Sequence, residues 1–152
     1  PIDPDETAPE LYERLARMGA ELLVQVVAEL AAGTASRTPQ DHEKATLAPM
    51  LSKELSPMDW NHTALQLHNQ VRGLLPWPAA VTTLNGSRCK VFATTVLEEH
   101  TQAEPGTILR ADKAGIDLAC GEGTVLRIDQ LQPDGGKRMK AADYLRGHPI
   151  VL

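Results

Sequence analysis

The chain has 152 residues, 42% of them hydrophobic, and a formal net charge of −5. This length suits one ordinary domain, or a small domain with an appendage, and the hydrophobic content is that of a globular protein. No apolar run approaches the roughly 20 residues that cross a bilayer, and no signal-peptide pattern is present, so the sequence argues against a membrane or secreted protein and for a cytoplasmic one.

The charge is unevenly distributed along the chain. Residues 1–55 carry ten acidic and five basic residues, whereas residues 56–152 carry ten of each. The second part is therefore able to present a basic face although the whole chain is acidic. Cys89 and Cys120 lie far apart without a CxxC or Cys/His spacing, which predicts buried, reduced thiols and no metal site.

The first predicted element is a long helix. Thr7 and Glu10 have the spacing of a capping box, with Pro9 in the first turn, and Gly33 is a natural stop. Gly19 is a candidate kink within it. Between these ends, apolar residues recur at helical spacing in the range 11–30. Such a stripe needs a partner, which predicts either the last helix of a domain whose other parts are missing, or self-association through Leu11–Leu30. Because Pro1 is an unusual start, we interpret the chain as a fragment.

Residues 34–57 are polar and rich in proline, and they predict a linker across a surface. Asp59 then predicts the cap of a second helix, whose apolar positions recur from Trp60 to Leu74. The helix must end before Pro76, and Trp77 lies between two prolines, which predicts a rigid corner where packing rather than chemistry is its role. His62 and His68 fall outside the apolar stripe, so both are predicted to face solvent.

Five short β segments follow, at 79–84, 88–97, 106–111, 115–120 and 124–131. Asn85-Gly86 predicts a tight hairpin between the first two, since both turn positions accept a positive φ. Gly121-Glu122-Gly123 predicts another turn rather than part of a dinucleotide fingerprint, because no helix follows it. Strands at this spacing without intervening helices predict a small closed barrel, and 141–146 predicts a short helix at one end. The fold class is therefore mainly β, an OB-like barrel of about five strands preceded by α-helices.

The sequence contains no convincing catalytic motif, and its best functional signal is basic. Three cations follow the flexible Gly135-Gly136 pair, two more alternate with Phe92 along the second β segment, and one ends the preceding helix. Cations and an aromatic residue on one face of a small barrel are typical of nucleic-acid binding, although ordinary surface charge would explain them equally well. These residues are Lys137, Arg138 and Lys140, Arg88 and Lys90, and Arg72.

At these residues the chain resembles the C-terminal part of the methionyl-tRNA formyltransferase family. Four phrases in the same order and spacing carry the resemblance over nearly the whole chain: Glu6-Thr7-Ala8 leading into Leu11-Tyr12; Leu51-Ser52-Lys53-Glu54 followed by Asp59-Trp60; Arg72-Gly73-Leu74-Leu75-Pro76-Trp77-Pro78; and Leu131-Gln132-Pro133-Asp134-Gly135-Gly136-Lys137-Arg138-Met139.

The resemblance implies a division of the chain into the terminal helical segment of a Rossmann-like formyl-transfer domain (1–36), a linker (37–57) and an OB-like barrel domain with its entry helix (58–152). It implies that the Asn/His/Asp catalytic set and the 10-formyltetrahydrofolate donor belong to a catalytic domain absent here, so that the fragment alone is inactive and binds no cofactor. The implied partner is initiator methionyl-tRNA. Lys53 matches a linker lysine that binds tRNA in the family, whereas Met50 stands where a basic residue is expected.

Two other interpretations remain open at this point. A sugar-nucleotide formyltransferase, or a relative that hydrolyses or dehydrogenates formyltetrahydrofolate, shares the two-domain plan but need not touch RNA. Alternatively, the barrel is a structural or protein-interaction module, as the unpartnered apolar stripe of the first helix suggests.

Overall fold

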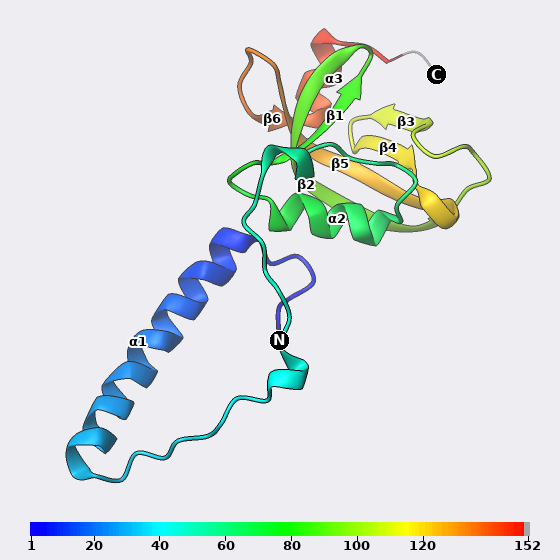
Figure 1. Cartoon of the computed structure of the whole chain (residues 1–152). Helices are drawn as coiled ribbons and strands as arrows, with labels where there is room; N and C mark the ends of the chain where they lie inside the picture. The colour runs from blue at the N-terminus through cyan, green and yellow to red at the C-terminus, as the bar shows by residue number, and fades with distance from the viewer. Residues whose placement is uncertain (151–152) are drawn as a thin grey trace. The chain divides into compact units, whose positions relative to one another are not determined.

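The computed structural model describes residues 1–150, and the chain divides into two compact units, Pro1–Met50 and Leu51–Leu152. Figure 1 labels their helices and strands. Within the described residues, no helix has the length and apolar character needed to span a membrane.

The first unit consists mainly of helix α1, Ala8–Ala32. The predicted cap is confirmed: the backbone N–H and the hydroxyl of Thr7 both donate to Glu10 Oε2, at 2.8 and 2.6 Å. Gly33 ends the helix in the left-handed region at φ 69°, which glycine adopts without steric cost. The helix runs without a break through Gly19, so the candidate kink is not formed. A 3-10 turn, η1, follows at His42–Lys44.

The second unit is built on a six-stranded antiparallel sheet with the order β1-β2-β5-β4-β3, and β6 pairs with β5 on the side. The predicted hairpin is confirmed, with Asn85 and Gly86 at φ 46° and 75° between β1 and β2. The strands are β1 Ala80–Leu84, β2 Ser87–His100, β3 Ile108–Asp112, β4 Gly115–Ala119, β5 Thr124–Pro133 and β6 Met139–Lys140.

Two helices accompany this sheet. Helix α2, Ala64–Gly73, packs against β2 and β5, and α3, Ala141–Gly147, packs against β5 and its neighbours. Two 3-10 turns complete the unit, η2 at Lys53–Leu55 and η3 at Gly121–Gly123. The core joins both helices to the sheet through fully buried side chains such as Leu67, Val91, Leu126, Ile128, Leu131 and Tyr144. Cys89 and Cys120 are free, buried thiols, as predicted.

The predicted start of the second helix is wrong. Helix α2 begins at Ala64, where Thr63 and Gln66 form a capping box, and Thr63 Oγ1 accepts from Gln66 N at 3.3 Å. Asp59 instead closes a turn of its own, because its Oδ1 accepts from the backbone N–H of Asn61 at 3.0 Å. Asp and Thr are both good capping residues, and the Gln three positions after Thr63 makes the second site the better one.

The prediction that His68 faces solvent is also wrong. Its side chain is 7% exposed and its Nδ1 lies 3.0 Å from the Thr94 hydroxyl of β2. The helix packs against the sheet along a wider face than its apolar stripe, since a polar residue is tolerated in a core when a neighbour satisfies it. Trp77 shows the converse, because it is 52% exposed although it was expected to pack.

Within residues 1–150 the sheet is open, since its end strands β1 and β3 do not pair, and it has six strands rather than the five expected. The predicted closed barrel is therefore not confirmed. The free edge of β1 is partly covered by the segment before α2. Val81 N donates to Ser56 O at 2.8 Å, Met58 N donates to Val81 O at 2.9 Å, and Pro57 forms a parallel bridge with Val81. The preceding turn η2, which carries Lys53, is thereby brought to the edge of the sheet.

Candidate nucleic-acid interface

Alternation along β2 separates a core face of the sheet from an outer one. Cys89 and Val91 are buried, whereas Arg88 and Lys90 between them are exposed. The neighbouring strands agree in register: Lys90 lies opposite Gln132 of β5, and Lys140 of β6 lies opposite Gln130. Since side chains alternate along each strand, these residues share the outer face.

We call this surface the cationic face and define it by five residues from four elements. Lys53 comes from η2, Arg88 and Lys90 from β2, and Arg138 and Lys140 from the end of the β5–β6 turn and β6. Neighbouring strands are about 4.8 Å apart, so the face crosses three strands within roughly 10 Å. Segments that are up to 87 positions apart in sequence, from 53 to 140, thus contribute to one surface.

A surface hollow of about 460 Å³ lies at the β1 end of the cationic face. Lys53 and Arg88 both line it, together with Val81, Thr83 and the ring of Trp60. Trp60 is held by a hydrogen bond from its Nε1 to Thr82 Oγ1 at 3.3 Å. The hollow therefore joins two of the predicted cations that the sequence alone could not connect.

At the other end of the face, Arg138 stacks on Phe92. Its guanidinium carbon lies 4.7 Å from the centre of the phenyl ring, and its Nε donates to Gln130 Oε1 at 3.0 Å. The register of β2 and β5 shifts between Val91 and Ala93, so Phe92 has no direct partner across the strands. A bulge of this kind redirects a side chain, and here it presents the ring to Arg138.

The charges of the cationic face are not used in ion pairs within the described residues. Other basic residues of the second unit do form ion pairs: Arg127 and Arg110 both pair with Asp117, and Arg146 pairs with Asp143. No such pair is recorded for the five residues of the face. A group of exposed cations without carboxylate partners produces a positive local field on a unit with balanced charge.

The two remaining predicted residues are not among the five that define the cationic face. Lys137 is exposed in the β5–β6 turn next to Arg138. Arg72 is in the last turn of α2, the helix that packs on the buried side of the sheet, and its Nε donates to Asn69 Oδ1 at 2.8 Å. Sequence reasoning overlooked Gln130 and Gln132, although their alternation with buried Leu131 was a usable signal.

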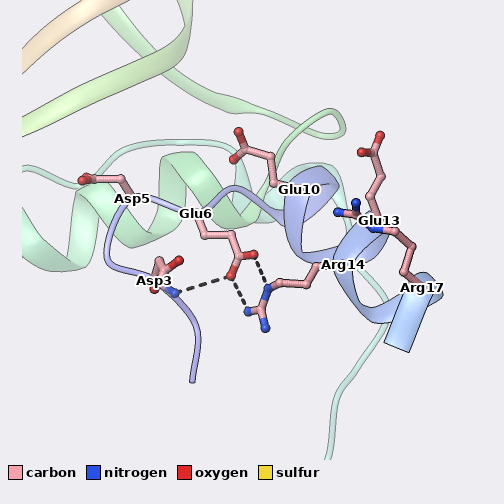
Figure 2. Close-up of a pocket in the computed structure, with 7 residues that line it drawn as sticks. All are labelled: Asp3, Asp5, Glu6, Glu10, Glu13, Arg14 and Arg17. Carbon is pink, nitrogen blue, oxygen red and sulfur yellow. Dashed lines mark hydrogen bonds and ion pairs between the residues drawn. The ribbon is translucent and has the colours of Figure 1, made fainter. Parts of the chain in front are cut away.

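A second surface hollow occurs in the first unit, and it has a different character. Figure 2 shows that it is lined mainly by acidic side chains. Arg14 donates two hydrogen bonds of 2.7 Å to the carboxylate of Glu6. Arg14 also donates to Pro1 O at 2.9 Å. These contacts hold the chain before α1 against its first turns, so we attribute this hollow to local folding rather than to a ligand. Its lining residues are Asp3, Asp5, Glu6, Glu10, Glu13, Arg14 and Arg17.

In residues 1–150 no cluster of three or more His, Cys, Asp or Glu side chains is placed to hold a metal ion. Four surface hollows in this part of the chain are open depressions, and they are lined by acidic, small polar, aliphatic or cationic residues.

The second unit is thus an antiparallel sheet with two helices and with exposed cations on its outer face. Residues 50–149 match the formyl transferase C-terminal domain family, and the chain belongs to that family. It is 44% identical to the methionyl-tRNA formyltransferase of Bacillus subtilis over 96% of this chain and 46% of that protein. It is 41% identical to that of Trichlorobacter lovleyi over 100% of this chain and 47% of that protein. The chain thus spans about half the length of the curated relatives it matches.

Solved structures of lower identity show the same fold. A variant of HypX from Aquifex aeolicus matches with a TM-score of 0.68 at 18% identity, over 95% of this chain and 26% of HypX. The HypX structure in complex with tetrahydrofolic acid matches with a TM-score of 0.60, over 82% of this chain and 22% of HypX. An N-formyltransferase from Helicobacter canadensis, in complex with folinic acid and dTDP-3-aminofucose, matches with a TM-score of 0.63 at 15% identity, over 84% of this chain and 46% of that one.

Proposed function

We propose that the chain is the tRNA-binding part of a cytoplasmic methionyl-tRNA formyltransferase, which transfers a formyl group from 10-formyltetrahydrofolate to the amino group of methionyl initiator tRNA. Its relatives carry that name, and the chain covers their length only in part. In this proposal residues 1–36 end the formyl-transfer domain, 37–57 are a linker, and 58–152 form an OB-like domain of which the coiled sheet is the barrel wall. The catalytic set and the folate site belong to the rest of the enzyme.

The observation that carries the proposal is the unpaired charge of the cationic face. The five residues of the cationic face come from distant parts of the chain: Lys53, Arg88, Lys90, Arg138 and Lys140. Arg110 and Arg127 of the same unit instead form ion pairs with Asp117. Phosphates are the natural partners of such a surface, since Lys and Arg contacts to phosphates position a nucleic acid without reading its sequence. The role of this domain is therefore positional: it holds the tRNA so that its aminoacylated end reaches the catalytic domain.

Titration of the 152-residue chain with initiator tRNA at several salt concentrations tests the proposal. Each duplex phosphate that is neutralised contributes about −0.9 to the slope of log K against log salt. Neutralising Lys90 and Lys140 together, as Lys90→Gln and Lys140→Gln, is expected to weaken binding and to flatten the slope by about 1 to 2. Lys137→Gln and Arg72→Gln are each expected to have a smaller effect of the same sign, because both residues lie outside the five that define the cationic face.

The matched control is Lys113→Gln, which removes an exposed lysine from the β3–β4 hairpin outside the cationic face. Like Lys90→Gln made alone, this change removes one positive charge, but we expect it to leave the slope of log K against log salt unchanged. Equal effects of Lys113→Gln and Lys90→Gln would show that only net charge matters. Binding at low salt no tighter than that of an inert acidic protein would refute an RNA-binding role for this chain.

A second candidate is a formyltransferase for amino sugars, as in the Helicobacter canadensis neighbour, or a formyltetrahydrofolate-hydrolysing relative. In either, the cationic face would not be needed for substrate binding. Charge reversal of Lys90 and Lys140 in the full-length enzyme separates the candidates. It should raise KM for tRNA several-fold under the first proposal and leave KM for a sugar nucleotide unchanged under the second.

A further inference from the structure

We propose that the Arg138–Phe92 stack on the cationic face receives one unpaired nucleobase of the bound RNA. This inference rests on the proposed RNA-binding function and adds to it a base-stacking site with a stated geometry. The resulting order would be phenyl ring, guanidinium plane and nucleobase.

The first argument is the way Arg138 is held. An exposed arginine usually samples many rotamers, but this one is fixed on two sides, by the ring of Phe92 beneath it and by Gln130 at its edge. The guanidinium lies over the ring on one side, and because Arg138 is exposed, its other side is accessible. Planar guanidinium groups and aromatic rings are the surfaces on which unpaired RNA bases stack.

The second argument is the placement of Phe92. It is the only phenylalanine of the chain, and it lies at a register shift on the outer side of β2 rather than in the core. An apolar ring on a charged surface is costly in water unless something covers it. Arg138 covers it in the free protein, and a base stacked on Arg138 would extend the same arrangement.

The third argument is the position of the neighbouring cations. Lys90 precedes Phe92 by two positions on the same strand face, and Lys140 follows Arg138 by two positions. Two residues along a strand span roughly 7 Å, which is close to the spacing of successive phosphates in a single strand. The stack is thus flanked on both strands by groups suited to the phosphates of the same nucleotide segment.

The proposal predicts a preference that charge alone would not produce. A base within a duplex has both of its faces covered, so only an unpaired nucleotide gains from the stack. Two variants remove stacking without removing charge or bulk: Arg138→Lys keeps the cation without the plane, and Phe92→Leu keeps an apolar side chain without the ring. Each is expected to weaken binding of an unpaired hexanucleotide about 5- to 20-fold, in line with base–aromatic stacking energies, and to change binding of a duplex of equal phosphate number less than 2-fold.

The experiment measures both RNAs against the 152-residue chain and the two variants, with 2-aminopurine in the hexanucleotide as a reporter of stacking. We expect quenching on binding to the unaltered chain and its loss with Phe92→Leu, while thermal unfolding confirms that each variant is folded. Leu65→Val, which shortens an exposed apolar side chain of α2 outside the cationic face, is the control for Phe92→Leu.

Equal weakening of both RNAs by the two variants, or no effect on either, would overturn the stacking site while leaving the RNA-binding function in place. If the unaltered chain bound neither RNA at low salt, the proposed function itself would fail, and the stacking site with it.

Discussion

Asp117 Oδ1 lies 2.6 Å from Arg127 Nε, and its other oxygen accepts from Arg110 Nε at 2.7 Å, so one carboxylate joins β3, β4 and β5. The Asp117 side chain is 1% exposed, whereas those of Arg127 and Arg110 are 24% and 42% exposed. A buried carboxylate is tolerated because two guanidinium groups replace its water.

Loss of this carboxylate should be among the more damaging polar changes in the chain. Breaking a fully buried ion pair costs about 3–5 kcal/mol, and we expect roughly 2–4 kcal/mol for Asp117→Asn because both arginines retain contact with water. Urea unfolding measures the loss. Glu99→Gln is the control, since the Glu99–Arg110 pair is exposed on both sides and should contribute under about 1 kcal/mol. Equal losses in the two variants would contradict this assignment.

Acid should destabilise the second unit partly through Asp117. Burial alone would raise the pKa of Asp117, but hydrogen bonds from Arg127 and Arg110 outweigh it and hold the pKa below the ordinary 3.8. A carboxyl whose pKa is lower in the folded state contributes stability above its unfolded pKa, and this contribution is lost as pH falls through the folded value. The free energy of unfolding should therefore fall below about pH 4, and it should fall less steeply in Asp117→Asn.

Titration of Asp129 should change the free energy of unfolding with pH in the opposite direction to titration of Asp117. Burial raises the pKa of Asp129 above 3.8, although the Thr95 hydroxyl donates to it at 2.8 Å. A raised carboxyl pKa favours the folded state at low pH and loses that contribution as pH rises through the folded value. Asp129→Asn should thus reduce stability at acidic pH relative to neutral pH, the reverse of Asp117→Asn. The same pH series of urea unfolding curves tests both, and the same pH dependence in the two variants would show that at least one of the two pKa directions is wrong.

Removal of the Thr94 hydroxyl should weaken the contact between α2 and the sheet. Thr94→Val leaves the shape of the side chain intact but leaves His68 Nδ1 without this partner in a buried environment. Such a loss costs about 1–3 kcal/mol, which a shift in the urea midpoint would report. Thr83→Val, the same change on the exposed side of β1, should be nearly neutral. A neutral Thr94→Val would show that His68 does not depend on that hydroxyl.

Gly121 should tolerate no side chain, in contrast to Gly73. A Cβ on Gly121 would overlap the carbonyl oxygen of Asn61, whereas nothing lies within 4 Å of the corresponding position at Gly73. Gly121 N also donates to the carbonyls of Trp60 and His62, at 2.9 and 2.8 Å. We expect Gly121→Ala to cost about 3 kcal/mol or more by overpacking, and Gly73→Ala, in a helix, to stabilise by up to about 1 kcal/mol. Thermal unfolding distinguishes these results, and equal midpoints would contradict the close approach.

The apolar stripe of α1 should make the chain self-associate in isolation. Leu15, Met18 and Leu22 are each more than half exposed, and no residue of α1 is buried. An exposed stripe of this size favours a partner, so sedimentation velocity should show a species that grows with concentration. Leu22→Glu should abolish it, while Ala28→Glu, on the opposite side of the helix, should not. A monomer at all concentrations would rule out self-association.

Local signals in the sequence were sufficient for several elements. The Thr7–Glu10 cap, the Gly33 stop, the Asn85-Gly86 hairpin and the short helix after Lys140 all depend on residues within a few positions of one another. The predicted start of α2 was wrong although a local signal for the right one exists: Asp59 and Thr63 are both good caps, and the capping box that Thr63 forms with Gln66 favours Thr63.

Two things could be inferred from the sequence because they depend only on residue type and spacing: the cations along strands and a turn that are available for binding, and the ordered phrases that indicate the family. Which cations share a surface depends on the tertiary structure. Strand pairing across β1, β2, β5 and β6 brings Lys53 and Lys140 to one face, whereas Arg72 lies on another element. The ion pairs of Arg110 and Arg127 with Asp117 likewise depend on the tertiary structure, because the register between strands, and not the distance along the chain, brings these side chains together.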